Sequence, residues 1–183
     1  GVGRFFRKEA LRETGGKVIN LLTKGSENHC RVQLRKSPAK HFEDVVNEIH
    51  YAEQQGVKVN VYLEDWSNGM RHSFAYVHEF LTRLQGLPVE RIMLPDTLGI
   101  LDPTEVTTYL EWLYRAFPDL RLDFHGHNDY GMVTANSLAA VRAGVNGIHT
   151  TINGLGERTG NQALAQLVVA INDMTNRRVR VVE

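Results

Sequence analysis

The chain has 183 residues, which is enough for one domain with a substantial core and too few to assume two. Lysine plus arginine equals aspartate plus glutamate at 21 each, so the formal net charge is zero and the basic excess typical of nucleic-acid-binding proteins is missing. No apolar run approaches the roughly 20 residues that span a bilayer, and no signal-peptide pattern opens the chain. Because there is one cysteine, Cys30, and no internal disulfide, we expect a cytoplasmic protein that binds neither nucleic acid nor membrane.

Short apolar stretches rich in β-branched residues alternate along the chain with amphipathic stretches. In chain order, the pattern predicts strands at 17–22, 57–63, 91–94, 120–125 and 147–152, and helices at 38–56, 74–84, 103–117, 133–143 and 161–174. Ser37 and Asp102 are suited to the N-caps of two of these helices. Gly56 and Gly144 are suited to helix ends.

The alternation of strands and helices predicts a parallel sheet, because each crossover must return the chain to the same edge. An open doubly wound sheet and a (β/α)8 TIM barrel both fit the spacing, but no G-x-G-x-x-G motif follows the first strand. In a barrel, catalytic groups gather where the strands end, and polar clusters follow the last four predicted strands, at 62–65, 95–97, 125–129 and 153–158. The sequence therefore predicts a single α/β domain over 1–183, a partial TIM barrel of about five βα units.

His125 and His127 carry the clearest chemical signal. They stand at positions i and i+2 at the end of a predicted strand, so both side chains point to the same face. Two imidazoles held in this way form a clamp for a divalent metal, although a hydrogen-bonded pair in a polar core remains the alternative. A metal site needs at least one more ligand. Asn153 could supply an amide oxygen from the next strand, and Asp129 is a weaker candidate.

Polar residues also end the two preceding strands. Glu64 shares a strand face with Tyr62, and a carboxylate there can act as an acid or base, orient a substrate, or form a structural ion pair. The hydroxyl of Thr97 can hydrogen-bond a substrate carboxylate. Asp96 is expected to brace its loop.

The remaining polar residues support less specific interpretations. The glycine-rich turn at 153–156 is weak evidence for phosphate binding, and Glu157 and Arg158 are expected to form a local ion pair. We expect solvated positions for five histidines that lack matching partners in the sequence: His29, His41, His50, His72 and His78.

Five motifs carry a family resemblance: L-L-T-K-G-S at 21–26, N-V-Y-L-E-D-W-S-N-G at 60–69, L-P-D-T-L-G at 94–99, F-H-G-H-N-D-Y at 124–130 and N-G-L-G-E-R at 153–158. In this order they resemble 2-isopropylmalate synthase and the related citramalate and homocitrate synthases. Hydroxymethylglutaryl-CoA lyase is a more distant relative. The resemblance covers about residues 11–174, and it is specific to the superfamily rather than to a substrate.

The resemblance implies a Claisen-type condensation of acetyl-CoA with a 2-oxo acid, performed by a metal-dependent acyltransferase of leucine biosynthesis. The implied metal is a divalent ion such as Mg, Mn or Zn. By position, the resemblance assigns metal binding to His125 and His127 with Asn153 at or beside the metal, the reacting centre to Glu64, the oxo-acid carboxylate to Thr97 and the pocket wall to Tyr62.

The sequence departs from the family in two ways. The D-T-x-R-D-G-x-Q motif of the family's first strand, which supplies a metal-binding aspartate and a catalytic arginine, does not occur, and neither does the family's C-terminal helical region. The five predicted strands correspond to the fourth through eighth of the barrel. We therefore expect this chain alone to be inactive or impaired, with an apolar interior and two sheet edges exposed. We also expect it to pair with another copy or to be part of a longer protein.

Three other functions remain open. The bulk of Tyr62 suggests a citramalate synthase that uses pyruvate. A lyase that runs the reverse cleavage is a second possibility. The third is a non-catalytic metal-binding or assembly module derived from the barrel.

Overall fold

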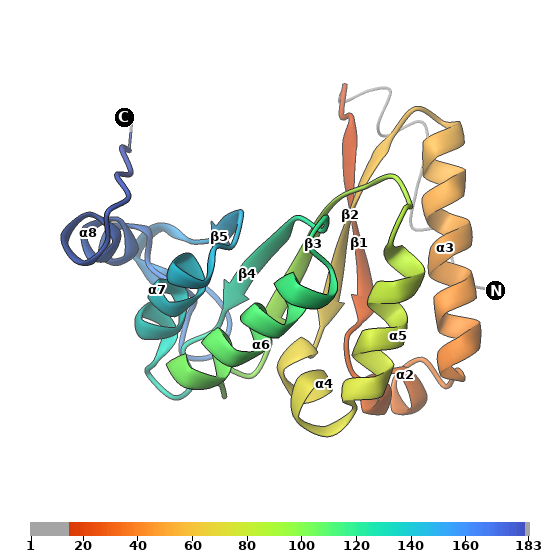
Figure 1. The fold of residues 1–183 in the computed structure, drawn as a ribbon, viewed down its shortest axis with the longest axis horizontal. Helices are drawn as coiled ribbons and strands as arrows, with labels where there is room; N and C mark the ends of the chain where they lie inside the picture. Colours follow the sequence, from red (N-terminus) through yellow and green to blue (C-terminus); the bar gives the residue numbers. More distant parts are fainter. Residues whose placement is uncertain (1–14, 182–183) are drawn as a thin grey trace.

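The computed structural model describes residues 15–181. Figure 1 shows a sheet with helices along one face. The strands are β1 (Val18–Lys24), β2 (Lys58–Glu64), β3 (Val89–Asp96), β4 (Leu122–Gly126) and β5 (Gly147–His149). The helices are α2 (Glu27–Val32), α3 (Pro38–Gln54), α4 (Trp66–His72), α5 (Phe74–Leu84), α6 (Pro103–Ala116), α7 (Val133–Ala143) and α8 (Leu164–Met174), with a 3-10 turn, η1 (Ile152–Gly154).

The five strands lie in chain order, β1-β2-β3-β4-β5, and every adjacent pair is parallel. Helices α3, α5, α6 and α7 cover one face of this sheet (Figure 1). The predicted α/β fold is thereby confirmed as a partial TIM barrel. All ten predicted elements are present, although β5 ends at His149 rather than at residue 152, where η1 begins.

Two short helices and one helix start differ from the prediction. Helices α2 and α4 follow β1 and β2 almost directly, and their six and seven residues are too few to produce a readable helical period. Helix α8 begins at Leu164 rather than at residue 161, because Asn161 forms an isolated antiparallel bridge with His127. No helix among residues 15–181 is long and apolar enough to cross a membrane.

Side-chain caps define the starts of the two helices for which they were predicted. The Asp102 carboxylate accepts from the backbone N–H of Glu105, and the Glu105 carboxylate accepts from the backbone N–H of Asp102, so α6 begins with a capping box. The hydroxyl of Ser37 accepts from the backbone N–H of Lys40 at the start of α3. These contacts satisfy N–H groups that the helices cannot satisfy internally.

The main hydrophobic core lies between the sheet and its helices. Alternate residues of β2, namely Val59, Val61 and Leu63, are at most 1% exposed and point into it. The rings of Phe42 on α3 and Phe80 on α5 stack against each other with centroids 4.7 Å apart. Burial of these apolar surfaces supplies most of the driving force for folding.

The opposite, concave face of the sheet is mostly polar, so the expectation of an exposed apolar interior was wrong. Its side chains pair across strands: Asn60 with Asn20, Lys24 with Glu64, and Arg91 with Asp123. These cross-strand pairs satisfy polar groups that face the inside of the barrel. Two large apolar side chains of β1, Val18 and Leu22, are exposed, at 45% and 63%.

Two histidines expected on solvated faces are not solvated. His41 is 4% exposed, because it packs against Phe80 and its Nε2 accepts from the backbone N–H of Lys24. The His29 side chain is 19% exposed and its Nε2 lies 3.4 Å from Asp65. Both contacts join residues from different elements, which the sequence pattern alone does not reveal.

Candidate functional site

The two histidines of the H-x-H motif converge at the C-terminal end of β4. The Nε2 atoms of His125 and His127 lie 3.2 Å apart, and the rings are nearly perpendicular. Two nitrogens bound to one metal at about 2.1 Å would be about 3.0 Å apart at a right angle and about 3.4 Å apart at the tetrahedral angle. The observed separation therefore fits a shared divalent ion, and it is also the length of a direct N–H···N hydrogen bond between the two rings.

The surroundings of this pair favour uncharged imidazoles. Burial, together with the neighbouring His127 and His149 rings, lowers the pKa of His125 to about 4. Burial and the Arg158 guanidinium also lower the pKa of His127. Both rings are therefore neutral near pH 7, which is the form that binds metals.

The amide that the structure brings to this pair is that of Asn161. Its backbone forms the bridge with His127, and its side-chain Oδ1 is buried without a hydrogen-bond partner among the described residues. The side chain also lies so close to Gly156 that a Cβ there would be 2.6 Å from its Oδ1, which explains why a glycine stands at that position. A buried amide oxygen without a partner is costly, and a cation would satisfy it.

Asn153, the amide expected from the sequence, has a different environment. It is exposed and lies within η1 with a left-handed backbone (φ 54°). Among residues 15–181, no third histidine, cysteine, aspartate or glutamate joins the histidine pair to complete a metal-binding cluster. The described part of the chain thus offers two imidazoles and the buried amide oxygen of Asn161, whose backbone is bridged to His127.

A second chain of contacts runs across the concave face beside the histidines. The Tyr62 hydroxyl lies 3.0 Å from Nδ1 of His149, and Nε2 of His149 lies 3.7 Å from Asp123. Asp123 in turn accepts from Nη1 of Arg91 at 2.7 and 3.0 Å. The rings of Tyr62 and His149 each contact the ring of His125. His149 had no signal in the sequence, because its partners come from two other strands, β2 and β4.

Glu64 and Thr97 both stand at the mouth, as the sequence predicted, and both are already engaged. Glu64 is paired with Lys24 at the aligned ends of β1 and β2. The Thr97 oxygen accepts from the backbone N–H of Asp65 at 2.8 Å, which leaves its own O–H free to donate. Asp96 braces its loop as expected: its buried carboxylate accepts from two backbone N–H groups, at Ile100 and Leu101.

Arg158 joins three of the loops that follow the strands. Its Nε and Nη2 donate to the two carboxylate oxygens of Asp129 at 2.7 and 2.8 Å, and Nη2 also donates to the carbonyl of Thr97. The guanidinium lowers the pKa of Asp129. The predicted pair with Glu157 is present, but its contact is 3.5 Å long and Glu157 is largely exposed. Asp129 is thus occupied by Arg158 rather than directed at a metal.

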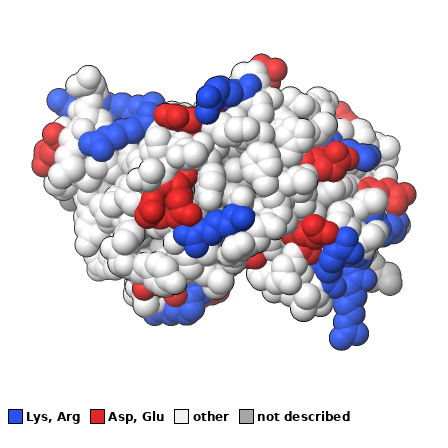
Figure 2. All heavy atoms as spheres, turned by 60° about the horizontal axis from the view of Figure 1, so that its bottom comes forward, with Lys and Arg blue, Asp and Glu red and all other residues white. Residues whose placement is uncertain are grey.

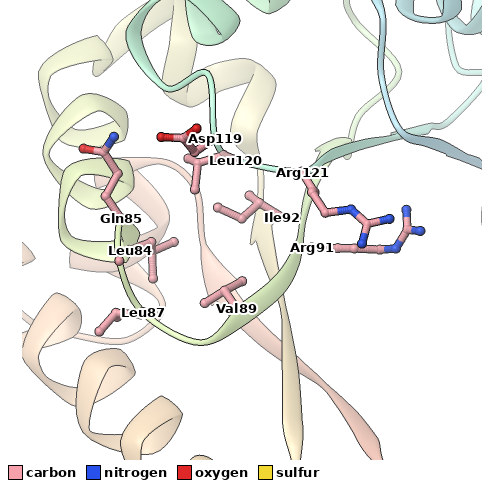
Figure 3. A pocket seen from close by; sticks show the side chains of 10 residues that line it. Leu84, Gln85, Leu87, Val89, Arg91, Ile92, Asp119, Leu120 and Arg121 are labelled. Carbon is pink, nitrogen blue, oxygen red and sulfur yellow. The ribbon is translucent and has the colours of Figure 1, made fainter.

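Two cavities lie at opposite ends of the sheet. A cleft of about 640 Å³ opens beside α2 and α4, at the end that carries the candidate site, and is lined in part by His29, Asp65 and Leu98. A smaller pocket of about 180 Å³ lies at the other end, around the start of β3, where Figure 3 shows Arg91 and Arg121 side by side. The smaller pocket is therefore separate from the candidate site. Figure 2 shows acidic and basic side chains interspersed over the visible face.

Sequence comparison finds related proteins that are named as synthases. The chain is 31% identical over 164 residues to a probable 2-isopropylmalate synthase of Ignicoccus hospitalis, covering 90% of this chain and 40% of the relative. It is 33% identical over 167 residues to a putative (R)-citramalate synthase of Methanopyrus kandleri, covering 91% and 32%. It is 36% identical over 146 residues to a homocitrate synthase of Saccharolobus solfataricus, covering 80% and 31%. The chain thus spans well under half the length of these relatives.

Solved structures agree on the fold. The hydroxymethylglutaryl-CoA lyases of Bacillus subtilis and Pseudomonas aeruginosa superpose with TM-scores of 0.80 and 0.79, at 23% and 24% identity, each covering 93% of this chain and 60% of the other. The HMGL-like family model matches residues 7–181, which is nearly the whole sequence. The chain therefore belongs to the HMGL-like family.

Proposed function

We propose that this chain forms part of a metal-dependent barrel that condenses acetyl-CoA with a 2-oxo acid, as an acyltransferase of amino-acid biosynthesis. The observation that carries the proposal is the 3.2 Å convergence of the His125 and His127 Nε2 atoms at the strand ends. The names of the sequence relatives, which are 2-isopropylmalate, citramalate and homocitrate synthases, support the same reaction class.

Three side chains are proposed to hold the divalent ion: His125, His127 and Asn161. The two imidazoles are neutral and their Nε2 atoms converge. The Oδ1 of Asn161, which has no hydrogen-bond partner among the described residues, supplies a hard oxygen ligand. Asn153 would contribute only if η1 rearranged, so we rank it second. A bound ion would supply Lewis-acid polarisation of the keto group.

The neighbouring residues are proposed to bind and orient the oxo acid. The O–H of Thr97 is free to donate to the substrate carboxylate, since its oxygen is already held by the N–H of Asp65. Glu64 places a carboxylate at the mouth, and the ammonium of Lys24 orients it. The cleft beside α2 adjoins this position and is the space we assign to acetyl-CoA.

A 2-isopropylmalate synthase, which acts in leucine biosynthesis, is the leading specific function. Citramalate formation from pyruvate is favoured by one observation: Leu22 and Tyr62 are aligned on neighbouring strands, so two bulky side chains lie next to each other on the face that carries the histidine pair. The alternative to an enzyme is a non-catalytic module that retains the metal site. The described sheet has five strands where a barrel has eight, so we propose that turnover requires further strands or a second copy.

The direct test measures CoA release from acetyl-CoA with pyruvate, 2-oxoisovalerate or 2-oxoglutarate in the presence of Mg²⁺, Mn²⁺ or Zn²⁺. CoA release is followed with a thiol-reactive dye. A blank without oxo acid corrects for the thiol of Cys30, which is buried and reacts with this dye only if the chain unfolds. Size-exclusion chromatography of the same sample reports whether copies associate. Turnover with one oxo acid supports the enzyme, whereas metal binding without turnover in folded protein whose copies associate supports the non-catalytic module.

A further inference from the structure

Among the described residues, the cations on the concave face around Tyr62 are all paired. Lys24, Lys58 and Arg91 form ion pairs with Glu64, Glu90 and Asp123 respectively. Arg121 lies beside the pocket at the other end of the strands (Figure 3). A ligand group that approaches Tyr62 therefore meets neutralised cations.

His149 determines what the Tyr62 hydroxyl offers to such a ligand. The Nε2 edge of the imidazole faces Asp123 at 3.7 Å, and the buried carboxylate favours the tautomer with its hydrogen on Nε2. Nδ1 is then an acceptor, and the Tyr62 hydroxyl donates its only hydrogen to it across 3.0 Å. The phenolic oxygen retains only lone pairs for a ligand.

Asp123 is held firmly enough to maintain this arrangement. Its side chain is 6% exposed and accepts twice from Arg91. Burial raises the cost of leaving it unpaired, and the guanidinium compensates for that cost. The order Arg91, Asp123, His149, Tyr62 is thus a continuous polar chain across β3, β4, β5 and β2.

We propose that His149 is a positioning residue that fixes the Tyr62 hydroxyl, so that the site accepts 2-oxo acids with an uncharged side chain and rejects those with a second carboxylate. A second carboxylate would face the lone pairs of Tyr62 and the charge of Asp123, while the cations on this face are already paired with carboxylates. This inference rests on the proposed function, because it assumes that a 2-oxo acid binds at the histidine pair. It separates pyruvate and 2-oxoisovalerate from 2-oxoglutarate.

The test measures binding to the full chain by calorimetry, with Mn²⁺ alone and then with each of these three acids in the presence of Mn²⁺. We expect the two acids with uncharged side chains to bind at least about tenfold more tightly than 2-oxoglutarate. His149→Ala frees the Tyr62 hydroxyl, so this ratio should fall severalfold while the affinity for Mn²⁺ is kept. His149→Asn offers an amide oxygen near the position of Nδ1 and should restore the ratio.

Two controls isolate the role of the hydroxyl. In a Tyr62→Phe background, His149→Ala should have no further effect on the ratio, because the group that it positions is gone. His50→Ala removes an exposed histidine on α3 and should change nothing.

Equal binding of the three acids to the native chain, or an unchanged ratio in His149→Ala, would overturn the specificity inference and leave the proposed function intact. Loss of Mn²⁺ affinity in His149→Ala would overturn it too, because His149 would then act through His125. If Mn²⁺ binds and none of the acids does, the proposed function fails and this inference fails with it.

Discussion

The guanidinium of Arg158 and the carboxylate of Asp129 form a two-contact ion pair that joins the loop after β5 to the loop after β4. The same guanidinium reaches the carbonyl of Thr97 in the loop after β3. Gly99 completes this junction, because its left-handed backbone (φ 57°) passes so close to Asp129 that a Cβ would lie 2.6 Å from the Asp129 nitrogen. Three loops at the mouth are thus fixed relative to one another by one side chain.

Removing this ion pair should loosen the mouth more than it destabilises the fold. For Arg158→Ala we expect a loss of about 1 kcal/mol or less in the free energy of unfolding, because both partners are partly exposed. Hydrogen exchange at 152–160 should accelerate, since those amides open without global unfolding. Mass-spectrometric hydrogen exchange measures this. Arg83→Ala, which breaks a similar exposed pair on α5, should leave these amides unchanged, and unchanged exchange in Arg158→Ala would contradict the prediction.

Metal affinity distinguishes the two candidate amides. His125→Ala and His127→Ala should each weaken Mn²⁺ or Zn²⁺ binding by at least about 10–100-fold. Loss of a group that only orients a metal ligand already costs roughly this much, and these variants remove a ligand itself. Asn161→Ala should reduce affinity about tenfold or more, since it removes a direct donor. Asn153→Ala should have little effect, because that side chain is exposed.

Calorimetric titration of each folded variant provides the measurement, with circular dichroism as a check on folding. Equal losses in Asn153→Ala and Asn161→Ala would mean that η1 moves when metal binds. Unchanged affinity in both histidine variants would show that the H-x-H motif is a hydrogen-bonded pair without a metal.

The sequence predicted the elements well because their signals are local. The i and i+2 spacing of His125 and His127 is enough to place both imidazoles on one face, and the N-cap of Asp102 is readable from its own helix. The partner of Tyr62 is not readable, because His149 is 87 residues away and β5 must first align with β4.

The choice between two amides shows the same limit. Asn153 directly follows the last predicted strand, and this position made it the expected metal ligand. The bridge between His127 and Asn161 depends on how the chain returns after η1, which no periodicity encodes. Likewise, the cross-strand pair of Lys24 and Glu64 on the concave face depends on the register of β1 against β2.

The capping box of α6 should have a measurable effect on stability. Asp102→Ala removes a side-chain acceptor from the helix N-terminus and leaves the N–H of Glu105 without its cap, so we expect a loss of about 1 kcal/mol. Chemical denaturation measures the change. Glu111→Ala, an exposed substitution in the middle of the same helix, should stay within about 0.5 kcal/mol of the native chain. A larger loss for Glu111→Ala than for Asp102→Ala would contradict this account.

His41 should make the fold sensitive to mild acid. Burial is the main cause that lowers its pKa from 6.5 to about 4, and the nearby charge of Lys36 adds to the effect. Between these two values the unfolded chain binds a proton that the folded chain does not, so stability falls as pH decreases through this window. The stability contributed by a neutral His41 is fully present above pH 6.5. By pH 4 the loss in the free energy of unfolding amounts to on the order of 3 kcal/mol.

His41→Gln isolates this contribution, because a glutamine oxygen can still accept from the N–H of Lys24 but does not titrate. The free energy of unfolding of the native chain, measured by urea denaturation from pH 4.5 to 7.5, should fall more steeply toward acid than that of the variant. The two partly buried histidines, His125 and His127, titrate equally in both proteins and cancel in the difference. Parallel curves would show that His41 becomes protonated without cost, which is incompatible with the 4% exposure of its residue and with its role as an acceptor for a backbone N–H.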